Sequence, residues 1–214
     1  MSGPAGSAGD APKGSELDAG SGVQAVVIGA SAGGVQALGE LLPAFAAGSA
    51  AVVFVVLHIP RDRPSLLTEV FSRRCALQVR EAQDKEPVAP GTIYFAPANY
   101  HLLVDEGPQL ALSADDLVHH SRPSIDVLFE SAAQVYGSRL LGVILTGANE
   151  DGAEGLAAVH DAGGVTVTQE PETAVASTMV LSAMQLRAPD HVLPLDRIAS
   201  LFKTVGLEPS LRTN

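Results

Sequence analysis

The stretch Ala25-Val-Val-Ile-Gly-Ala-Ser-Ala-Gly-Gly34 sets the architecture of this chain. Its first half is an apolar, β-branched run that ends abruptly at Gly29, and apolar residues then recur at helical spacing from Val35 to Phe45. This pattern predicts a strand, a sharp turn and an amphipathic helix. Ser31 is therefore expected at the carboxyl end of the strand, where amides of the helix start can stabilise a nearby negative charge.

The turn around Ser31 has three competing interpretations. Gly29-Ala-Ser-Ala-Gly33 fits the pattern G-x-S-x-G, in which a nucleophilic serine is presented on a tight elbow. The segment also nearly fits the dinucleotide pattern G-x-G-x-x-G, but Ser31 stands where the middle glycine would let the backbone approach a pyrophosphate. A serine is also favoured as a helix N-cap whatever its chemistry. The turn by itself leaves nucleophile, phosphate site and helix cap open.

The composition bounds the class of protein and its partners. The chain has 214 residues, which suits one domain, and its 13 Lys and Arg against 24 Asp and Glu give a formal net charge of −11. It has no basic run, so we expect neither nucleic acid nor an anionic membrane surface as a partner. Its longest apolar runs have the length of strands, so we expect no direct membrane insertion. The single cysteine, Cys75, cannot form an internal disulfide, and no signal-peptide pattern is present, so we expect a cytoplasmic protein.

The organisation of the chain predicts an α/β fold. Residues 1–22 are rich in Gly, Ser, Ala and Pro and predict a disordered leader, followed by one domain over 23–207 and a tail over 208–214. Apolar strands alternate with helical patterns, which predicts a doubly wound, mostly parallel sheet flanked by helices. Three short apolar segments within 91–112 predict a small antiparallel β extension. The other predicted strands are 51–57, 140–145 and 165–168, and the other predicted helices are 64–75, 123–135, 156–161 and 198–205.

Two further polar residues follow buried strands. His58 comes directly after the apolar run 52–57, and Asp151 lies in the loop after 140–145. The carboxyl ends of parallel strands meet at one edge of a sheet, so Ser31, His58 and Asp151 are a candidate catalytic triad. Ser31 would attack an acyl carbon, His58 would carry its proton, and Asp151 would orient the imidazole. The plainer alternatives are a surface histidine and a turn-forming aspartate.

The remaining titratable residues give weaker signals. His119 and His120 are adjacent and have no spaced third ligand, so we expect no metal site. Most of the other carboxylates lie in polar segments, and we expect them to be solvated. These are Asp84, Asp105, Asp115, Asp116 and Asp126.

Several sequence blocks resemble the catalytic domain of CheB-type chemotaxis methylesterases, also called protein-glutamate methylesterase/glutaminase. The resemblance covers roughly residues 26–202, and in this family the positions of Ser31, His58 and Asp151 form the triad. The blocks are Ile28–Gly34, Leu57–Pro60, Pro90–Pro97 with His101-Leu102, Ser121–Phe129, Gly142–Gly147 and Asp151-Gly152.

The resemblance implies an activity and a partner. It implies hydrolysis of γ-glutamyl methyl esters on the cytoplasmic helices of chemoreceptors or of a receptor-like protein, with release of methanol, and in many members deamidation of glutamine. No cofactor is implied. The oxyanion would be held by backbone amides at the helix start, from Ala32 and Gly33, and by the loop amide of Ala148.

The chain also departs from the family pattern. Many members carry a receiver domain before this one, and here we expect only the leader before Val23. Gly147-Ala-Asn149 stands where Gly-Met-Gly is common, and Ala32 where threonine is frequent. These changes motivate an alternative, a weak or inactive CheB-like module that binds receptor or kinase. Nucleotide binding ranks lowest, because the middle glycine of its motif is missing.

Overall fold

The computed structural model describes residues 22–58, 66–107 and 109–207. The predicted leader, except for Gly22, and the predicted tail lie outside these residues. So does Pro64, which was expected to open a helix.

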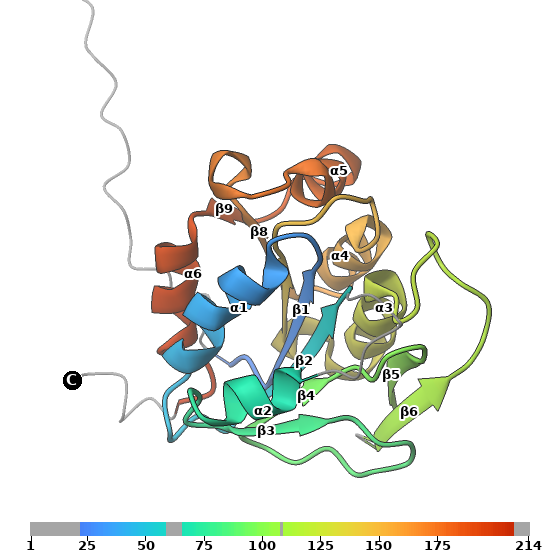
Figure 1. Ribbon diagram of the computed structural model, residues 1–214, viewed down its shortest axis with the longest axis vertical. Coiled ribbons are helices and arrows are strands. Elements are labelled where there is room, and N and C mark those ends of the chain that lie inside the picture. Colours follow the sequence, from blue (N-terminus) through green and yellow to red (C-terminus); the bar gives the residue numbers. More distant parts are fainter. Residues whose placement is uncertain (1–21, 59–65, 108, 208–214) are drawn as a thin grey trace, which may run out of the picture.

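The core of the molecule is a seven-stranded parallel sheet in the order β3-β4-β2-β1-β7-β8-β9 (Figure 1). Its central strands β1 (Ala25–Ala30), β2 (Val52–Leu57) and β7 (Leu140–Ile144) are buried along their whole length. Continuous apolar strands are typical of parallel sheets that are covered on both faces. The outer strands are β3 (Gln78–Glu81), β4 (Thr92–Phe95), β8 (Val165–Gln169) and β9 (His191–Leu193).

Helices cover both faces of this sheet, which confirms the predicted doubly wound fold. One core, which contains Val26 and Ile28, packs against α1 (Gly34–Leu41), α2 (Leu67–Ser72) and α6 (Leu195–Phe202). The other core, which contains the alternate residues Ala25 and Val27, packs against α3 (Ile125–Tyr136), α4 (Ala153–Asp161) and α5 (Thr178–Leu186). Short 3-10 turns occur at Leu42–Ala44, Gly137–Arg139 and Pro171–Thr173.

The predicted antiparallel extension is right in part. Strands β5 (His101–Asp105) and β6 (Gln109–Ser113) form an antiparallel hairpin. The segment Thr92–Phe95 instead joins the main sheet as β4, parallel to β2 and β3. Its Ile93 packs in one core and its Tyr94 in the other, so both faces are covered. Such two-sided burial suits an inner strand of a parallel sheet.

Strand β3 and helix α5 were not expected from the sequence. Strand β3 is a polar edge strand with no buried residue, so it lacks the apolar pattern that marks a strand. Helix α5 has a weakly periodic sequence, so no helix was predicted there. No helix in the described part of the chain is long and apolar enough to cross a membrane.

Candidate active site

The turn after β1 presents Ser31 at the carboxyl edge of the sheet. The Ser31 N–H donates to the Thr146 carbonyl oxygen at 3.0 Å, and the Gly34 N–H donates to the Ser31 carbonyl oxygen at 2.8 Å. The left-handed residue of this turn is Gly33, with φ of 82°. Among the described residues Ser31 is not one with positive φ, so the strained elbow suggested by G-x-S-x-G is not formed at the serine. Gly33 is also the N-cap of α1, so the interpretation of Ser31 as that cap is wrong.

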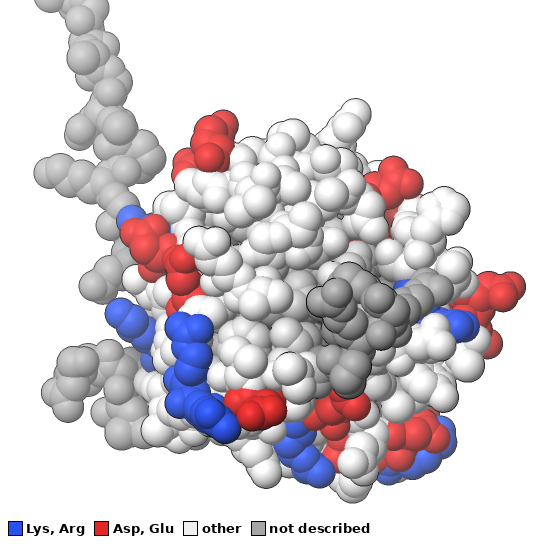
Figure 2. Space-filling model, in the orientation of Figure 1, with Lys and Arg blue, Asp and Glu red and all other residues white. Residues whose placement is uncertain are grey.

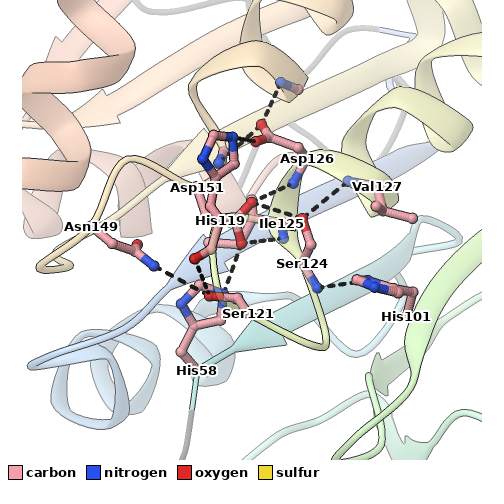
Figure 3. A network of polar contacts seen from close by, with 12 residues as sticks. His58, His101, His119, Ser121, Ser124, Ile125, Asp126, Val127, Asn149 and Asp151 are labelled. Atoms are coloured by element: carbon pink, nitrogen blue, oxygen red, sulfur yellow. Dashed lines mark hydrogen bonds and ion pairs between the residues drawn. The ribbon is translucent and has the colours of Figure 1, made fainter. Parts of the chain in front are cut away.

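His58 and Asp151 are brought together by the fold. The His58 N–H donates to the Ala30 carbonyl oxygen at 3.0 Å, which places His58 beside the Ser31 turn on the neighbouring strand. Its Nε2 lies 2.9 Å from Oδ2 of Asp151 (Figure 3). The His58 side chain is 14% exposed and the Asp151 side chain is fully buried. The residues predicted as base and orienting carboxylate therefore form a shielded pair.

The Asp151 carboxylate is held by the N-terminus of α3. Oδ1 accepts from the Ser124 hydroxyl at 2.7 Å and the Asp126 N–H at 3.1 Å, and Oδ2 accepts from the Ile125 N–H at 2.8 Å and from His58. These four donors fill the acceptor capacity of the carboxylate. Burial acts to raise the pKa of Asp151, but the hydrogen bonds outweigh burial and hold the pKa below its usual value. Asp151 therefore stays ionised next to His58.

Asp126 is buried, so the expectation that it is solvated is wrong. Its Oδ1 accepts from the Gly152 N–H at 2.9 Å and the Gly155 N–H at 2.7 Å, at the start of α4. Burial, together with the nearby charge of Asp151, raises the pKa of Asp126 to about 7, despite those two hydrogen bonds. The other expected surface carboxylates are exposed, namely Asp84, Asp105, Asp115 and Asp116.

His101 binds the N-cap residue of the same helix, α3. It is almost fully buried, its Nδ1 accepts from the Ser124 N–H at 3.1 Å, and its Nε2 donates to the Asp116 carbonyl oxygen at 3.0 Å. The sequence placed His101 on a short strand and gave it no role. The strand β5 therefore contributes to the position of Asp151 through Ser124.

The predicted oxyanion amides are available. The N–H groups of Ala32, Gly33 and Ala148 donate no hydrogen bond to any other described residue. The Ser31 N–H is used by Thr146, whose hydroxyl also donates to the Ala32 carbonyl oxygen at 2.7 Å. Thr146 thus fixes the peptide planes of the turn while leaving the next two N–H groups unused.

The surface around this edge carries few charges. Strands β1, β2 and β7 and helix α5 contain no Asp, Glu, Lys or Arg, and the region over α1 and α5 is largely uncharged (Figure 2). Exposed apolar side chains on it include Val35 at 51% and Val175 at 71%. In the described part of the chain no group of three or more His, Cys, Asp or Glu side chains is arranged to hold a metal ion.

The residues that support Asp151 were not assigned that role from the sequence. Ser124, Ile125 and Asp126 form the first turn of α3 with its cap, and Ser followed by an acidic first turn is a helix-start signal that was available in the sequence. The side-chain oxygen of Gln169 accepts from the Thr146 N–H at 3.0 Å. No local sequence pattern indicated a role for either residue. Their roles come from packing between distant segments.

Known proteins are similar to this chain over most of its length. A family model described as CheB methylesterase matches residues 26–202. A Leptospira interrogans protein is 42% identical over 179 residues, which cover 84% of this chain and 93% of that protein. A Symbiobacterium thermophilum protein named protein-glutamate methylesterase/protein-glutamine glutaminase is 40% identical over 182 residues, which cover 85% of this chain and 50% of that protein.

A solved structure shows the same fold. The crystal structure of the Thermotoga maritima CheB methylesterase catalytic domain aligns with a TM-score of 0.80 and 33% identity, and covers 86% of this chain and 99% of that chain. The chain spans about half the length of the Symbiobacterium relative and of a Rhodospirillum rubrum relative with the same two activities in its name. The match over 26–202 and these identities show that the chain belongs to the CheB methylesterase family of hydrolases.

Proposed function

We propose that this chain hydrolyses γ-glutamyl methyl esters on a methylated chemoreceptor or a receptor-like signalling protein in the cytoplasm. Ser31 is the nucleophile, His58 the general base and Asp151 the orienting carboxylate. The observation that carries the proposal is the 2.9 Å contact between His58 Nε2 and the buried Asp151, at the end of the strand beside the Ser31 turn. The names of the relatives support the substrate class.

The contact between His58 and Asp151 supports a role for each nitrogen of His58. Because Asp151 is ionised and can only accept, Nε2 carries the proton and donates a hydrogen bond to the carboxylate. Nδ1 then holds the lone pair that takes the proton from the Ser31 hydroxyl. Asp151 fixes this tautomer and stabilises the imidazolium that forms.

The reaction proceeds in two halves. The Ser31 oxygen adds to the ester carbonyl carbon, and His58 passes the serine proton to the leaving methoxide, so methanol departs and a glutamyl-serine ester remains. Water then adds to that ester with His58 as base, and the carboxylate and the serine hydroxyl are released. A glutamine side chain would give the same acyl-enzyme with ammonia as leaving group.

The unused amides of Ala32, Gly33 and Ala148 support their proposed role as donors to the developing oxyanion. They lie at the start of α1 and in the loop after β7, and the described structure uses none of them as donors. Fixed N–H groups of this kind stabilise the charge without reorganisation during the reaction. The alternative of an inactive scaffold is not favoured by the relatives, which are named for both activities.

The test is methanol release from methylated receptor fragments by the native chain and by Ser31→Ala. We expect the variant to lose release almost completely, while its circular dichroism stays unchanged. Ser200→Ala on the exposed face of α6 is the matched control, because it removes a serine hydroxyl that, among the described residues, donates only to the Asp196 carbonyl oxygen. Methanol release by Ser31→Ala at the native rate would refute the assignment of the nucleophile.

A further inference from the structure

At the N-termini of α3 and α4, each helix is capped by a carboxylate from the other helix start (Figure 3). Asp151, which precedes α4, accepts from the Ile125 and Asp126 N–H groups at the start of α3. Asp126, which belongs to the first turn of α3, accepts from the Gly152 and Gly155 N–H groups at the start of α4. The first N–H groups of a helix have no acceptor within that helix. Here each carboxylate accepts hydrogen bonds from such N–H groups of the other helix.

Helix α4 depends on the Asp126 carboxylate because its own N-cap residue supplies no side-chain acceptor. Its N-cap is Gly152, with φ of 103° and no side chain to accept a hydrogen bond. A Cβ at Gly155 would lie 2.9 Å from Cα of Asp126, so the glycine lets the two helix starts approach closely. The side chain of Asp126 is the only one among the described residues that accepts from these α4 amides. It thus sets where the segment carrying Asp151 meets α3.

We propose that Asp126 is a positioning residue of the triad: by capping α4 it holds Asp151 in place against His58, while His119 lies against its second carboxylate oxygen. This inference rests on the proposed function for its kinetic consequences, while the geometry itself concerns only the triad. Asp126 touches no reacting atom, and it acts through Asp151.

His119 is held in an unusual backbone conformation that brings it to this pair. His119 and His120 have φ of 46° and 60°, in a turn closed by hydrogen bonds between the backbones of Val118 and Ser121. Left-handed conformations are costly for residues other than glycine and cluster at functional sites. From this turn His119 Nε2 lies 3.4 Å from Oδ2 of Asp126, an oxygen that accepts no hydrogen bond.

The other nitrogen of His119 reaches the loop that follows β7. Nδ1 lies 3.2 Å from Oε1 of Glu150, next to the loop that supplies Ala148. Asn149 is tied to the same turn, since its side-chain amide donates to the Ser121 hydroxyl at 3.3 Å. His119 therefore links Asp126 to the loop on the other side of the site.

Two buried carboxylates side by side explain the electrostatics. The titratable groups that face Asp126 are Asp151, His119 and, through these two, His58 and Glu150. Asp151 is saturated with donors and stays ionised, so the pair carries its exchangeable proton on Asp126. The pKa of about 7 for Asp126 means that its charge changes within the physiological range.

The test compares Asp126→Ala and Asp126→Asn in the full chain. The alanine variant removes the cap, whereas the asparagine variant keeps a carbonyl oxygen for Gly152 and Gly155. Asp190→Ala is the matched control, because Asp190 also accepts two hydrogen bonds, both from Thr166, near the opposite, amino end of β8. The readouts are kcat, KM and the rate at which a fluorophosphonate modifies Ser31.

We expect Asp126→Ala to lower kcat and the rate of Ser31 modification by about tenfold to a hundredfold, with KM within about twofold, because misplacement of a catalytic group acts on the transition state. Asp126→Asn should recover most of both rates, and Asp190→Ala should change neither. A folded Asp126→Ala with native rates, an Asp126→Asn as slow as the alanine variant, or an equal loss in Asp190→Ala would each overturn the proposal.

A second measurement covers the case in which Asp126→Ala does not fold. The rate of Ser31 modification by the native chain should show an ionisation near pH 7 that Asp126→Asn lacks, and identical profiles would overturn the proposal. Fluorophosphonate modification needs no methyl ester. A native chain whose Ser31 is modified but which releases no methanol would therefore refute the proposed substrate and leave the positioning role to be judged on the variants.

Discussion

The Ser124 hydroxyl lies 2.7 Å from Oδ1 of Asp151, so the N-cap residue of α3 also donates a hydrogen bond to the carboxylate that orients His58. The hydroxyl oxygen of Ser124 also accepts a hydrogen bond from the Val127 N–H at 3.5 Å. One side chain thus connects the stability of a helix to the position of a group in the proposed triad.

Ser124→Ala should therefore affect both stability and rate. Loss of the cap is expected to lower the free energy of unfolding by about 1 kcal/mol. Loss of the bond to Asp151 should also lower kcat about tenfold, because one donor to the ionised carboxylate is removed. Urea unfolding and methanol release measure the two effects, with Ser200→Ala as control. Unchanged kcat in a variant with lowered stability would separate the cap from the chemistry.

The pH dependence of stability should carry the signature of Asp126. Its pKa is raised to about 7 in the folded protein, so its contribution is fully present below the ordinary carboxyl pKa and is lost as pH rises through about 7. Asp126→Asn has no such ionisation. We expect this variant to gain stability relative to the native chain by a few kcal/mol between pH 4 and pH 8.

The measurement is urea unfolding of both proteins at several pH values across that range, since the difference between them cancels the titrating groups that do not contact Asp126. Asp151 is present in both proteins and affects the free energy of unfolding with the opposite sign. Because its pKa is lowered, it stabilises the folded state above the ordinary carboxyl pKa, and this stabilisation is lost only in acid. A difference that does not vary with pH would contradict a buried, titrating Asp126.

Gly33→Ala should disturb the turn that presents Ser31. Gly33 has φ of 82°, and a Cβ there would lie 2.7 Å from Cβ of Val175. We expect a loss of about 1–3 kcal/mol in the free energy of unfolding and a larger fractional loss of activity. Val175→Gly in the same chain should relieve the clash and restore part of both, while the strain of positive φ remains. Additive effects of the two substitutions would show that the contact with Val175 does not matter.

The sequence by itself predicted the parts of this protein that depend on local patterns. The apolar runs before Ser31, His58 and Asp151 mark buried parallel strands, and the rule that their carboxyl ends share one edge was enough to bring the first two side by side. Periodicity also predicted helices on both faces. It did not mark β3, whose residues other than Val79 are polar, or distinguish β4 from the hairpin that follows it.

Only the tertiary structure decided what surrounds Asp151. The hydrogen bonds from Ser124, Ile125 and Asp126 join segments that are 25 to 27 residues apart, and the bond from His58 spans 93 residues. The burial of Asp126 likewise follows from the contact of α3 with α4. A periodic pattern shows that one face of a helix is buried, but the residues it meets are set by the packing of the whole chain, and the pKa values of Asp126 and Asp151 follow from that packing.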